Sequence, residues 1–313
     1  MRILCCLLAL VSSLAAAATP NIVIIFMDDM GYADVGCFGA QGYQTPNIDK
    51  LAAEGRKFTN FHVAQPVCSA SRTALLTGCY PNRLGMHGAL GPSAKHGINA
   101  DEMTIAELVK QKGYATAAVG KWHLGYGTAE RCDYTKELKP GPLEIGFDYH
   151  FGVPANHGDM AGVYVENHWV LGLNKESPSQ PSPPYVTMGQ QKGKPTKTLD
   201  LNAPKRVDEN VMETLTDKIV NWIGQQSAEK PFFVYFTPVA VHNPITPSKG
   251  TAGKSKGGPF CDFISDLDLS VGRVLDVLEQ KDFAKDTLVI FTSDNGGVNK
   301  PENANLVQTD AQK

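Results

Sequence analysis

The sequence predicts an α/β fold in which helices sandwich a mainly parallel central sheet. Two observations carry this prediction. Short apolar runs alternate with amphipathic stretches along the chain, and the apolar runs end in clusters of ionisable or amide side chains. The chain has 313 residues, of which 42% are hydrophobic, and this suits one large globular domain with a core of its own.

Four apolar runs are predicted to be strands, because they are short, contain many β-branched or aromatic residues and are bounded by polar ones. The runs are NIVIIF (21–26), YATAAVG (114–120), PFFVYFTPVAV (231–241) and TLVIFTS (287–293).

Helix start and stop signals lie between these runs. PNIDKLAAEG (46–55) has proline at the first helical position and glycine at its end, and MTIAELVKQKG (103–113) also stops at glycine. Further along, segment 261–280 repeats apolar residues at helical spacing, which predicts a core-facing stripe. The stripe is formed by Phe263, Leu267, Val271, Val274 and Leu278. The acids of that segment, Asp262, Asp266 and Asp268, are then expected on the solvated face.

Residues 1–18 have the composition of a secretory signal peptide, with one basic residue, an apolar stretch and an alanine-rich exit. A buried strand or a membrane anchor is the alternative, but the apolar run is shorter than the roughly 20 residues that a spanning helix needs. We expect export to the periplasm or the extracellular space. Residues 19–313 would then form the folded domain, and the Pro-, Ser-, Gln- and Lys-rich part of 171–210 an irregular, substrate-facing insertion.

The charge of the chain argues against two classes of partner. The formal net charge is −3, and no run of Lys or Arg stands out. We therefore expect neither nucleic acid nor a membrane surface as a partner.

The cysteine count leaves one thiol over. Cys5 and Cys6 belong to the predicted signal peptide, and five cysteines remain in the mature chain. In an oxidising compartment thiols usually pair. If Cys68 is the unpaired one, the other four allow two disulfides in three possible pairings.

Polar clusters follow all four predicted strands. Asp28 and Asp29 follow the first, Asp294 and Asn295 follow the last, and Lys121, His123 and His242 follow the other two. The carboxyl ends of parallel strands share one edge of a sheet, so these side chains are expected to form one site. Carboxylate and amide oxygens favour a hard cation, and Ca²⁺ suits an exported protein. The alternative is that each acid pair only caps a turn or a helix.

Cys68 does not suit such a site as a thiol. Sulfur is a soft ligand, and a thiol with an ordinary pKa near ~8.5 is mostly protonated at neutral pH. Yet SASRTALLTG (69–78) predicts a helix whose first amides would favour an anion, and Arg72 adds a guanidinium. The surroundings therefore suit an oxyanion.

CSASRTALLTG (68–78) resembles the signature of the formylglycine-dependent sulfatases, arylsulfatase-type members of the alkaline phosphatase superfamily, in which this cysteine is oxidised to an aldehyde. Four more segments resemble motifs of that family, in the same order. They are NIVIIFMDDMGYADVGCFG (21–39), TPNIDKLAAEGRKFTNFH (45–62), GKWHLG (120–125) and LVIFTSDNGG (288–297).

The resemblance implies the hydrolysis of sulfate esters. It implies one Ca²⁺ held by Asp28, Asp29, Asp294, Asn295 and the formylglycine at position 68. Arg72 would orient the formylglycine, Lys121 and His242 would hold the sulfate oxygens, and His123 would contact a formylglycine hydroxyl. The implied partners are a sulfated small molecule or polysaccharide and a formylglycine-generating maturation enzyme.

The chain departs from the family pattern after LVIFTSDNGG (288–297), the segment that contains Asp294 and Asn295. Family members continue into a segment with another active-site lysine and an antiparallel carboxyl-terminal subdomain. We expect this subdomain to be missing, the catalytic domain to be incomplete and a face or edge of the sheet to be uncovered. Neither Lys300 nor Lys313 is assigned the role of that lysine.

Two other functions remain open at this point. The first is a phosphate or phosphonate monoester hydrolase on the same fold, and the second is an inactive relative that only binds sulfated glycans.

A loop that contains His157 and Asp159 is a candidate contact to substrate.

Overall fold

The computed structural model describes residues 19–159, 162–176 and 203–297. The predicted signal peptide and most of the predicted insertion lie outside these ranges. The strands are β1 (Asn21–Met27), β2 (Ala115–Lys121), β3 (Tyr149–Val153), β4 (Val165–Glu166), β5 (Trp169–Val170), β6 (Phe232–Thr237) and β7 (Thr287–Ser293). The α-helices are α1 (Pro46–Glu54), α2 (Cys68–Thr77), α3 (Ile105–Gln111), α4 (Val211–Gly224) and α5 (Pro259–Gln280). Short 3₁₀ helices are η1 (Gly36–Phe38), η2 (Pro81–Leu84), η3 (Pro142–Ile145), η4 (Asp208–Asn210) and η5 (Ala284–Asp286).

The strands form one sheet with the order β5-β4-β3-β2-β6-β1-β7. Pairing from β3 to β7 is parallel, whereas β3, β4 and β5 pair antiparallel. The predicted α/β fold with a mainly parallel sheet is confirmed. The strands β3, β4 and β5 were not predicted, and the last two are only two residues long, too short for a hydrophobic period to show.

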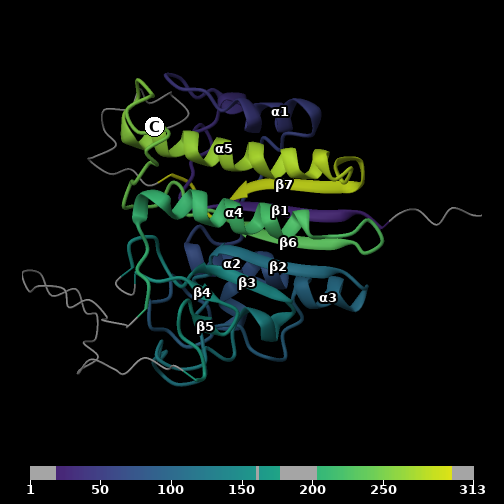
Figure 1. Cartoon of the computed structure of the whole chain (residues 1–313), viewed down its shortest axis with the longest axis vertical. Coiled ribbons are helices and arrows are strands. Elements are labelled where there is room, and N and C mark those ends of the chain that lie inside the picture. The colour runs from purple at the N-terminus through teal and green to yellow at the C-terminus, as the bar shows by residue number, and fades with distance from the viewer. Residues whose placement is uncertain (1–18, 160–161, 177–202, 298–313) are drawn as a thin grey trace, which may run out of the picture.

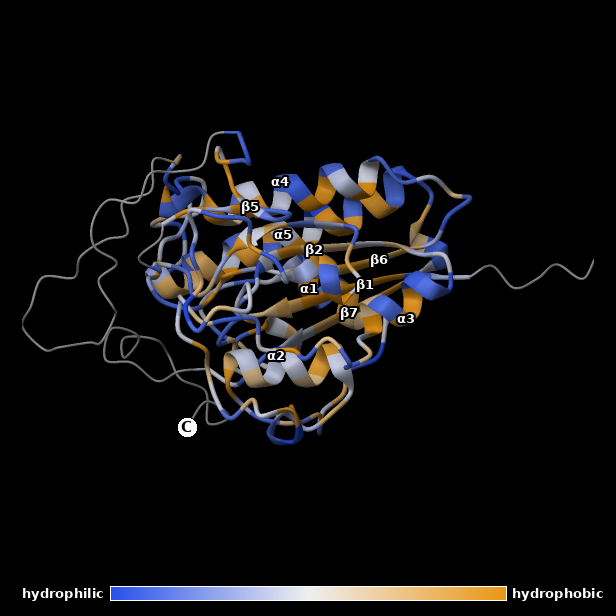
Figure 2. Cartoon of the chain, turned by 90° about the horizontal axis from the view of Figure 1, so that it is seen from below, coloured by the Kyte–Doolittle hydropathy of each residue, from blue (hydrophilic) through white to orange (hydrophobic). Residues whose placement is uncertain are grey.

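Helices cover both faces of the sheet. Residues of α1, α4 and α5 join one apolar cluster, and residues of α2 and α3 join another on the opposite face. Figure 1 shows α4 and α5 running along the sheet, and Figure 2 shows α2 and α3 on the side away from them. The predicted sandwich of helices and sheet is therefore present.

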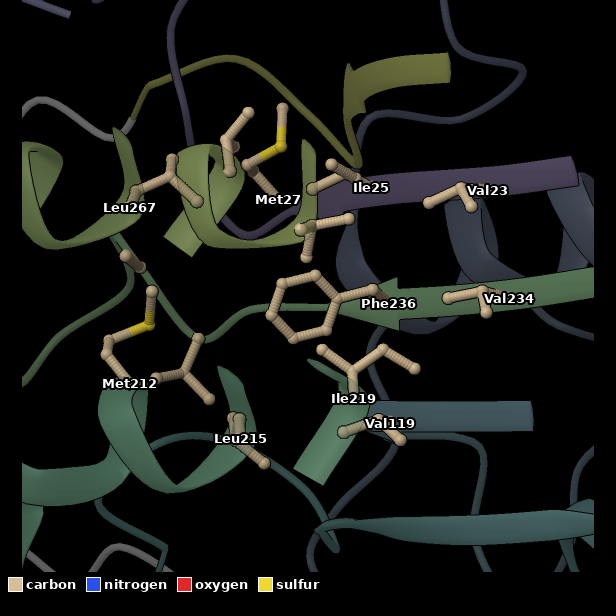
Figure 3. Packing of buried hydrophobic residues seen from close by; sticks show 14 of the residues in the cluster. Val23, Ile25, Met27, Val119, Met212, Leu215, Ile219, Val234, Phe236 and Leu267 are labelled. Carbon is tan, nitrogen blue, oxygen red and sulfur yellow. The ribbon is translucent and has the colours of Figure 1, made fainter. Parts of the chain in front are cut away.

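Alternating side chains of the strands enter the two cores. In β1, Val23, Ile25 and Met27 pack toward α4 and α5, whereas Ile24 and Phe26 pack toward α2. Figure 3 shows the first core, where side chains of β1, β2 and β6 meet Met212, Leu215 and Ile219 of α4 and Leu267 of α5. Each such aliphatic side chain, fully buried, stabilises the fold by about 1.5–3 kcal/mol.

Helix α5 confirms one prediction and corrects another. Its stripe from Phe263 to Leu278 is buried, as expected. The expectation that Asp262, Asp266 and Asp268 lie on a solvated face is wrong, since all three are buried. Each accepts hydrogen bonds from a chain segment packed over the helix. Asp262 accepts from the backbone of Gly253 and Ser255, and Asp266 accepts from the backbone and hydroxyl of Ser248.

Asp268 reaches a distant helix. Its carboxylate accepts the backbone N–H groups of Asn47 and Ile48, at 3.0 and 2.9 Å, in the first turn of α1. The negative charge thus meets amides that have no partner within their own helix. The buried acids of α5 are anchors for loops and for α1.

All five cysteines of the described part are free, so the two disulfides considered above are not formed there. The predicted strand 231–241 is shorter in the structure, because β6 ends at Thr237, well before His242. Within the described residues β7 is an edge strand, and its Leu288 and Ile290 are exposed. No helix in the described ranges has the length and apolar character to cross a bilayer.

Candidate active site

The first acid loop begins where β1 ends. The backbone N–H of Asp28 donates to the carbonyl of Ala240, and the Asp28 carbonyl accepts from Val241, so the loop after β6 holds this turn. Asp29 has a left-handed backbone with φ of 59°. Adjacent residues in a regular strand would face opposite sides of the sheet. Because Asp28 and Asp29 lie in a turn instead, both can lie at the carboxyl edge of the sheet.

The second acid loop lies beside the first because β7 pairs with β1, with Met27 opposite Ser293. The Asp29 backbone N–H donates to Asp294 Oδ1 at 3.1 Å, and Asn295 Nδ2 donates to Asp29 Oδ1 at 2.8 Å. The two predicted acid pairs, 265 positions apart in the chain, therefore form one cluster.

Cys68 opens α2 next to this cluster. Its Sγ and one carboxylate oxygen each of Asp28 and Asp294 all lie within 4.8 Å of one another. Burial raises the pKa of the thiol to about 11, with the charges of Asp28 and Asp294 acting in the same direction and Lys121 and Arg72 against it. At neutral pH the side chain is a thiol, so it is not an activated thiolate.

Arg72, one turn further along α2, is fully buried and joins both acid loops. Its Nη2 lies 2.7 Å from Asp294 Oδ2 and 3.3 Å from Asp28 Oδ1, while Nη1 donates to the carbonyl of Lys121 at 3.1 Å. Burial alone would lower the pKa of the guanidinium, but Asp294 and other neighbours hold the pKa above its usual value. Its charge compensates the two carboxylates.

Lys121, at the end of β2, contacts Asp28 directly. Its Nζ lies 2.7 Å from each carboxylate oxygen of Asp28, and neither side chain is exposed. Burial would raise the pKa of Asp28, but Lys121, Arg72 and His242 hold it well below its ordinary value. Burial and the charge of Asp28 raise the pKa of Asp294. The two carboxylates therefore differ strongly in their tendency to ionise.

His123 lies just beyond Lys121, with a left-handed backbone at φ of 55°. Its Nε2 lies 2.8 Å from the carbonyl of Leu90. A carbonyl can only accept, so Nε2 carries the hydrogen and Nδ1 presents a lone pair. Nδ1 is buried and has no hydrogen-bond partner among the described residues. Burial, and then the charges of Lys121 and Arg72, lower the pKa of His123 well below its usual value, so the ring is neutral.

His242 lies near the first acid loop, and His157 contacts the loop that carries His242. His242 Nε2 is 3.8 Å from Asp29 Oδ2. His157 Nε2 lies 2.6 Å from the hydroxyl of Thr246, in the loop that carries His242. Asp159 is occupied elsewhere, because its carboxylate accepts from Arg206 at 3.3 Å.

All nine predicted site residues thus gather at one edge of the sheet, but sequence analysis missed the residues that support them. Ser293 Oγ accepts from the Met30 backbone and donates to the Asn295 carbonyl, which links the two acid loops. Thr237 Oγ1 donates to the Lys121 carbonyl at 2.8 Å. The only sequence signal for either is a hydroxyl residue at the carboxyl end of a strand.

The donor set suits a hard cation. Oxygens of Asp28 and Asp294 lie within 4.8 Å of each other. The neighbouring Asp29 offers a third carboxylate, and Asn295 can add its amide oxygen if the amide turns away from Asp29. Lys121 contacts both oxygens of Asp28, so a cation ligated by Asp28 would compete with that ammonium group. The carboxylates fit Ca²⁺ in charge and chemistry.

A family model described as Sulfatase matches residues 20–311 of this chain. The chain belongs to the sulfatase family. The N-acetylgalactosamine-6-O-sulfatase of Bacteroides thetaiotaomicron is 35% identical over 305 residues, and the match covers 89% of this sulfatase and 59% of that protein. Human arylsulfatase A is 36% identical over 295 residues, with 93% and 54% covered. This sulfatase therefore spans somewhat more than half the length of these relatives.

Solved structures agree with this assignment. A structure from a study of glycosaminoglycan metabolism by B. thetaiotaomicron superposes on this sulfatase with a TM-score of 0.80 at 33% identity, covering 90% of this chain and 64% of that one. The phosphonate monoester hydrolase of Agrobacterium radiobacter superposes with a TM-score of 0.56 at 16% identity, which shows a shared fold only. The predicted alkaline-phosphatase-like architecture is confirmed.

Proposed function

We propose that this sulfatase hydrolyses sulfate esters, using a formylglycine derived from Cys68 and one Ca²⁺ bound by the two acid loops. The observation that carries the proposal is the placement of a protonated thiol among Asp28, Asp294, Arg72 and Lys121. A thiol with a pKa of about 11 is a poor nucleophile and a poor ligand for a hard cation. Conversion to an aldehyde would replace sulfur by oxygen at this position.

The modified residue and the cation supply defined chemistry. A hydrated aldehyde at position 68 offers an oxygen nucleophile and a second hydroxyl for release of sulfate, and Ca²⁺ favours the ionised form of the nucleophile. Asp28, Asp29, Asp294 and Asn295 would hold the cation.

The cationic side chains would stabilise charge on the sulfuryl group. Lys121, which pairs with Asp28, would contact a sulfate oxygen, and Arg72 would remain paired with Asp294. Fixed positive charge in a buried site is worth more than the same charge in water. His242, whose Nε2 lies 3.8 Å from Asp29 Oδ2, would contact the substrate sulfate.

His123 would act as a proton acceptor. Its ring is neutral, its hydrogen lies on Nε2, and its Nδ1 lone pair is free within the described part of the chain. A hydroxyl at position 68 would donate to this nitrogen.

The comparisons support a class of substrate. The relatives reported above are named for N-acetylgalactosamine 6-sulfate or aryl sulfate hydrolysis. We propose a sulfated sugar or aryl sulfate as substrate, selected in part by the insertion at 171–210. We also propose export to the periplasm or extracellular space and a formylglycine-generating enzyme as a maturation partner.

One experiment tests the proposal in two steps. The protein is produced with a formylglycine-generating enzyme, and mass spectrometry of the tryptic peptide 58–72 reads the state of Cys68. Turnover of an aryl sulfate is then compared with turnover of an aryl phosphate, with Cys68→Ala as the control. We expect an aldehyde at position 68, sulfate turnover and no activity in the control.

Other results point to the alternatives. An unmodified thiol with full activity contradicts the formylglycine proposal. A preference for phosphate favours a phosphate or phosphonate monoester hydrolase. Binding of sulfated glycans that persists in Cys68→Ala, with no turnover in either protein, favours an inactive glycan-binding relative.

A further inference from the structure

Ser69, the residue after Cys68, links three separate parts of the site. Its side chain is fully buried. The hydroxyl donates to the backbone carbonyl of His123 at 2.7 Å and accepts the backbone N–H of Leu90 at 2.9 Å. The hydroxyl therefore bonds once as donor and once as acceptor, to residues that lie 54 and 21 positions away in the chain.

These two bonds close a ring of contacts around His123. Leu90, whose N–H binds Ser69, also supplies the carbonyl that faces His123 Nε2 at 2.8 Å. Ser69 thus fixes the His123 backbone directly and the imidazole indirectly, through the peptide units at Leu90. These contacts connect position 68, the residue before Ser69 in the chain, to the imidazole whose Nδ1 is proposed to accept its proton.

His123 needs such support because its backbone is unusual. Its φ of 55° lies in the left-handed region, which non-glycine residues rarely adopt unless their surroundings determine it. The His123 N–H donates to the carbonyl of Pro154 at 3.0 Å, and its carbonyl is held by Ser69. Both polar groups of the backbone are therefore fixed by other segments.

We infer that Ser69 is a positioning residue that holds the imidazole of His123 in its Nε2–H tautomer, with Nδ1 left to accept a proton. The inference rests on the proposed function for its catalytic consequence. Its structural content is independent of substrate: without the hydroxyl, the Leu90 amide loses its acceptor, the carbonyl is no longer fixed, and the imidazole is free to take the other tautomer.

The test compares Ser69→Ala with Ser69→Thr, which keeps the hydroxyl. Thr73→Val is the matched control, because Thr73 is buried on the same helix and its hydroxyl has no hydrogen-bond partner among the described residues. All proteins are produced with the maturation enzyme, and kcat is expressed per formylglycine, as measured on peptide 58–72. This removes any effect of Ser69 on the modification of its neighbour.

We expect Ser69→Ala to lose about tenfold to a hundredfold in kcat with KM nearly unchanged, since binding of substrate does not use the hydroxyl. Ser69→Thr should recover most of the loss, and Thr73→Val should match the wild type. Equal kcat in Ser69→Ala and the wild type overturns the inference. So does a loss in Thr73→Val as large as that in Ser69→Ala.

A second measurement needs no substrate. In ¹⁵N-histidine NMR, the His123 signals are assigned by their absence from His123→Gln, and their shifts report the tautomer. The wild type should show Nε2–H alone and Ser69→Ala a mixture. An unchanged tautomer in Ser69→Ala overturns the inference, whether or not the wild type turns over a sulfate ester. Absence of sulfate ester turnover by the wild type would count against the proposed function and not against this inference.

Discussion

Nη2 of Arg72 lies 2.7 Å from Oδ2 of Asp294, a residue 222 positions later in the chain. The same nitrogen lies 3.3 Å from Asp28. One guanidinium thus joins α2 to both acid loops, in a region with no exposure to solvent. Two ionised carboxylates can be buried side by side only when a cation compensates them.

Replacement of Arg72 by Gln should damage both stability and activity. The two carboxylates would lose their shared partner, and we expect the free energy of unfolding to fall by about 3–5 kcal/mol. Formylglycine-normalised kcat/KM should fall about a hundredfold or more, because Asp294 loses its charged partner while Lys121 compensates only Asp28. Chemical denaturation and aryl sulfate kinetics measure the two effects. Arg56→Gln, at an exposed position, should change neither, and a stable, active Arg72→Gln would contradict this account.

Calcium should stabilise the protein through Asp294. A ligand present at a hundred times its Kd adds about 2.7 kcal/mol to the free energy of unfolding. Asp294→Asn removes one negative charge from the donor set, so most of this calcium-dependent stabilisation should disappear. Thermal unfolding with and without Ca²⁺, after treatment with a chelator, measures it. The exposed Asp286→Asn is the control, and the same calcium response in both variants would place the cation elsewhere.

The protein should lose stability in mild acid because it buries neutral histidines. His150 is buried between the Ala118 carbonyl, 3.1 Å from Nδ1, and the Tyr126 hydroxyl, 3.1 Å from Nε2. Burial lowers its pKa from 6.5 to about 4. Between these values the unfolded chain binds more protons than the folded one, so stability falls as pH falls through this window.

The measurement is the free energy of unfolding at about pH 7.5 and about pH 5. His150→Gln should reduce the difference between the two by about 2 kcal/mol, because each pH unit below the unfolded pKa is worth about 1.4 kcal/mol. His62→Gln, at an exposed position, should leave the difference unchanged. A pH dependence that His150→Gln does not alter would show that other groups cause it.

Asp268 should stabilise the fold without contributing to turnover. Its carboxylate accepts two backbone N–H groups at the start of α1, and Asp268→Ala would leave these amides without a partner. We expect a loss of about 1–3 kcal/mol in the free energy of unfolding. The exposed Asp276→Ala on the same helix is the matched control. Equal stability of the two variants, or a large fall in kcat for Asp268→Ala, would be the opposite result.

Much of the candidate site is predictable because strand ends are visible in the sequence. The apolar runs before Asp28 and Asp294 and before Lys121 identify three parallel strands, and parallel strands bring their carboxyl ends to one edge. The misfit of Cys68 with its neighbours is also a property of residue types alone.

The buried acids of α5 show where such reasoning stops. Asp262, Asp266 and Asp268 have the sequence pattern of a solvated helix face, yet each meets backbone amides from a segment packed over the helix. No local period reveals those partners, since they come from loops and from α1. The strands β4 and β5 are missed for a related reason, because two residues form a strand only when a neighbouring strand pairs with them.

The sequence by itself determined the fold class, the family and the residue types at the site, because hydrophobic period and motif order are local properties of the chain. Only the tertiary structure decided which charged groups are in contact and which nitrogen of His123 carries the hydrogen. Arg72 lies between Asp28 and Asp294, and Leu90 sets the tautomer of His123. These contacts depend on distances of about 3 Å between residues far apart in the chain, and hydrogen bonds and buried charges are decided at that scale.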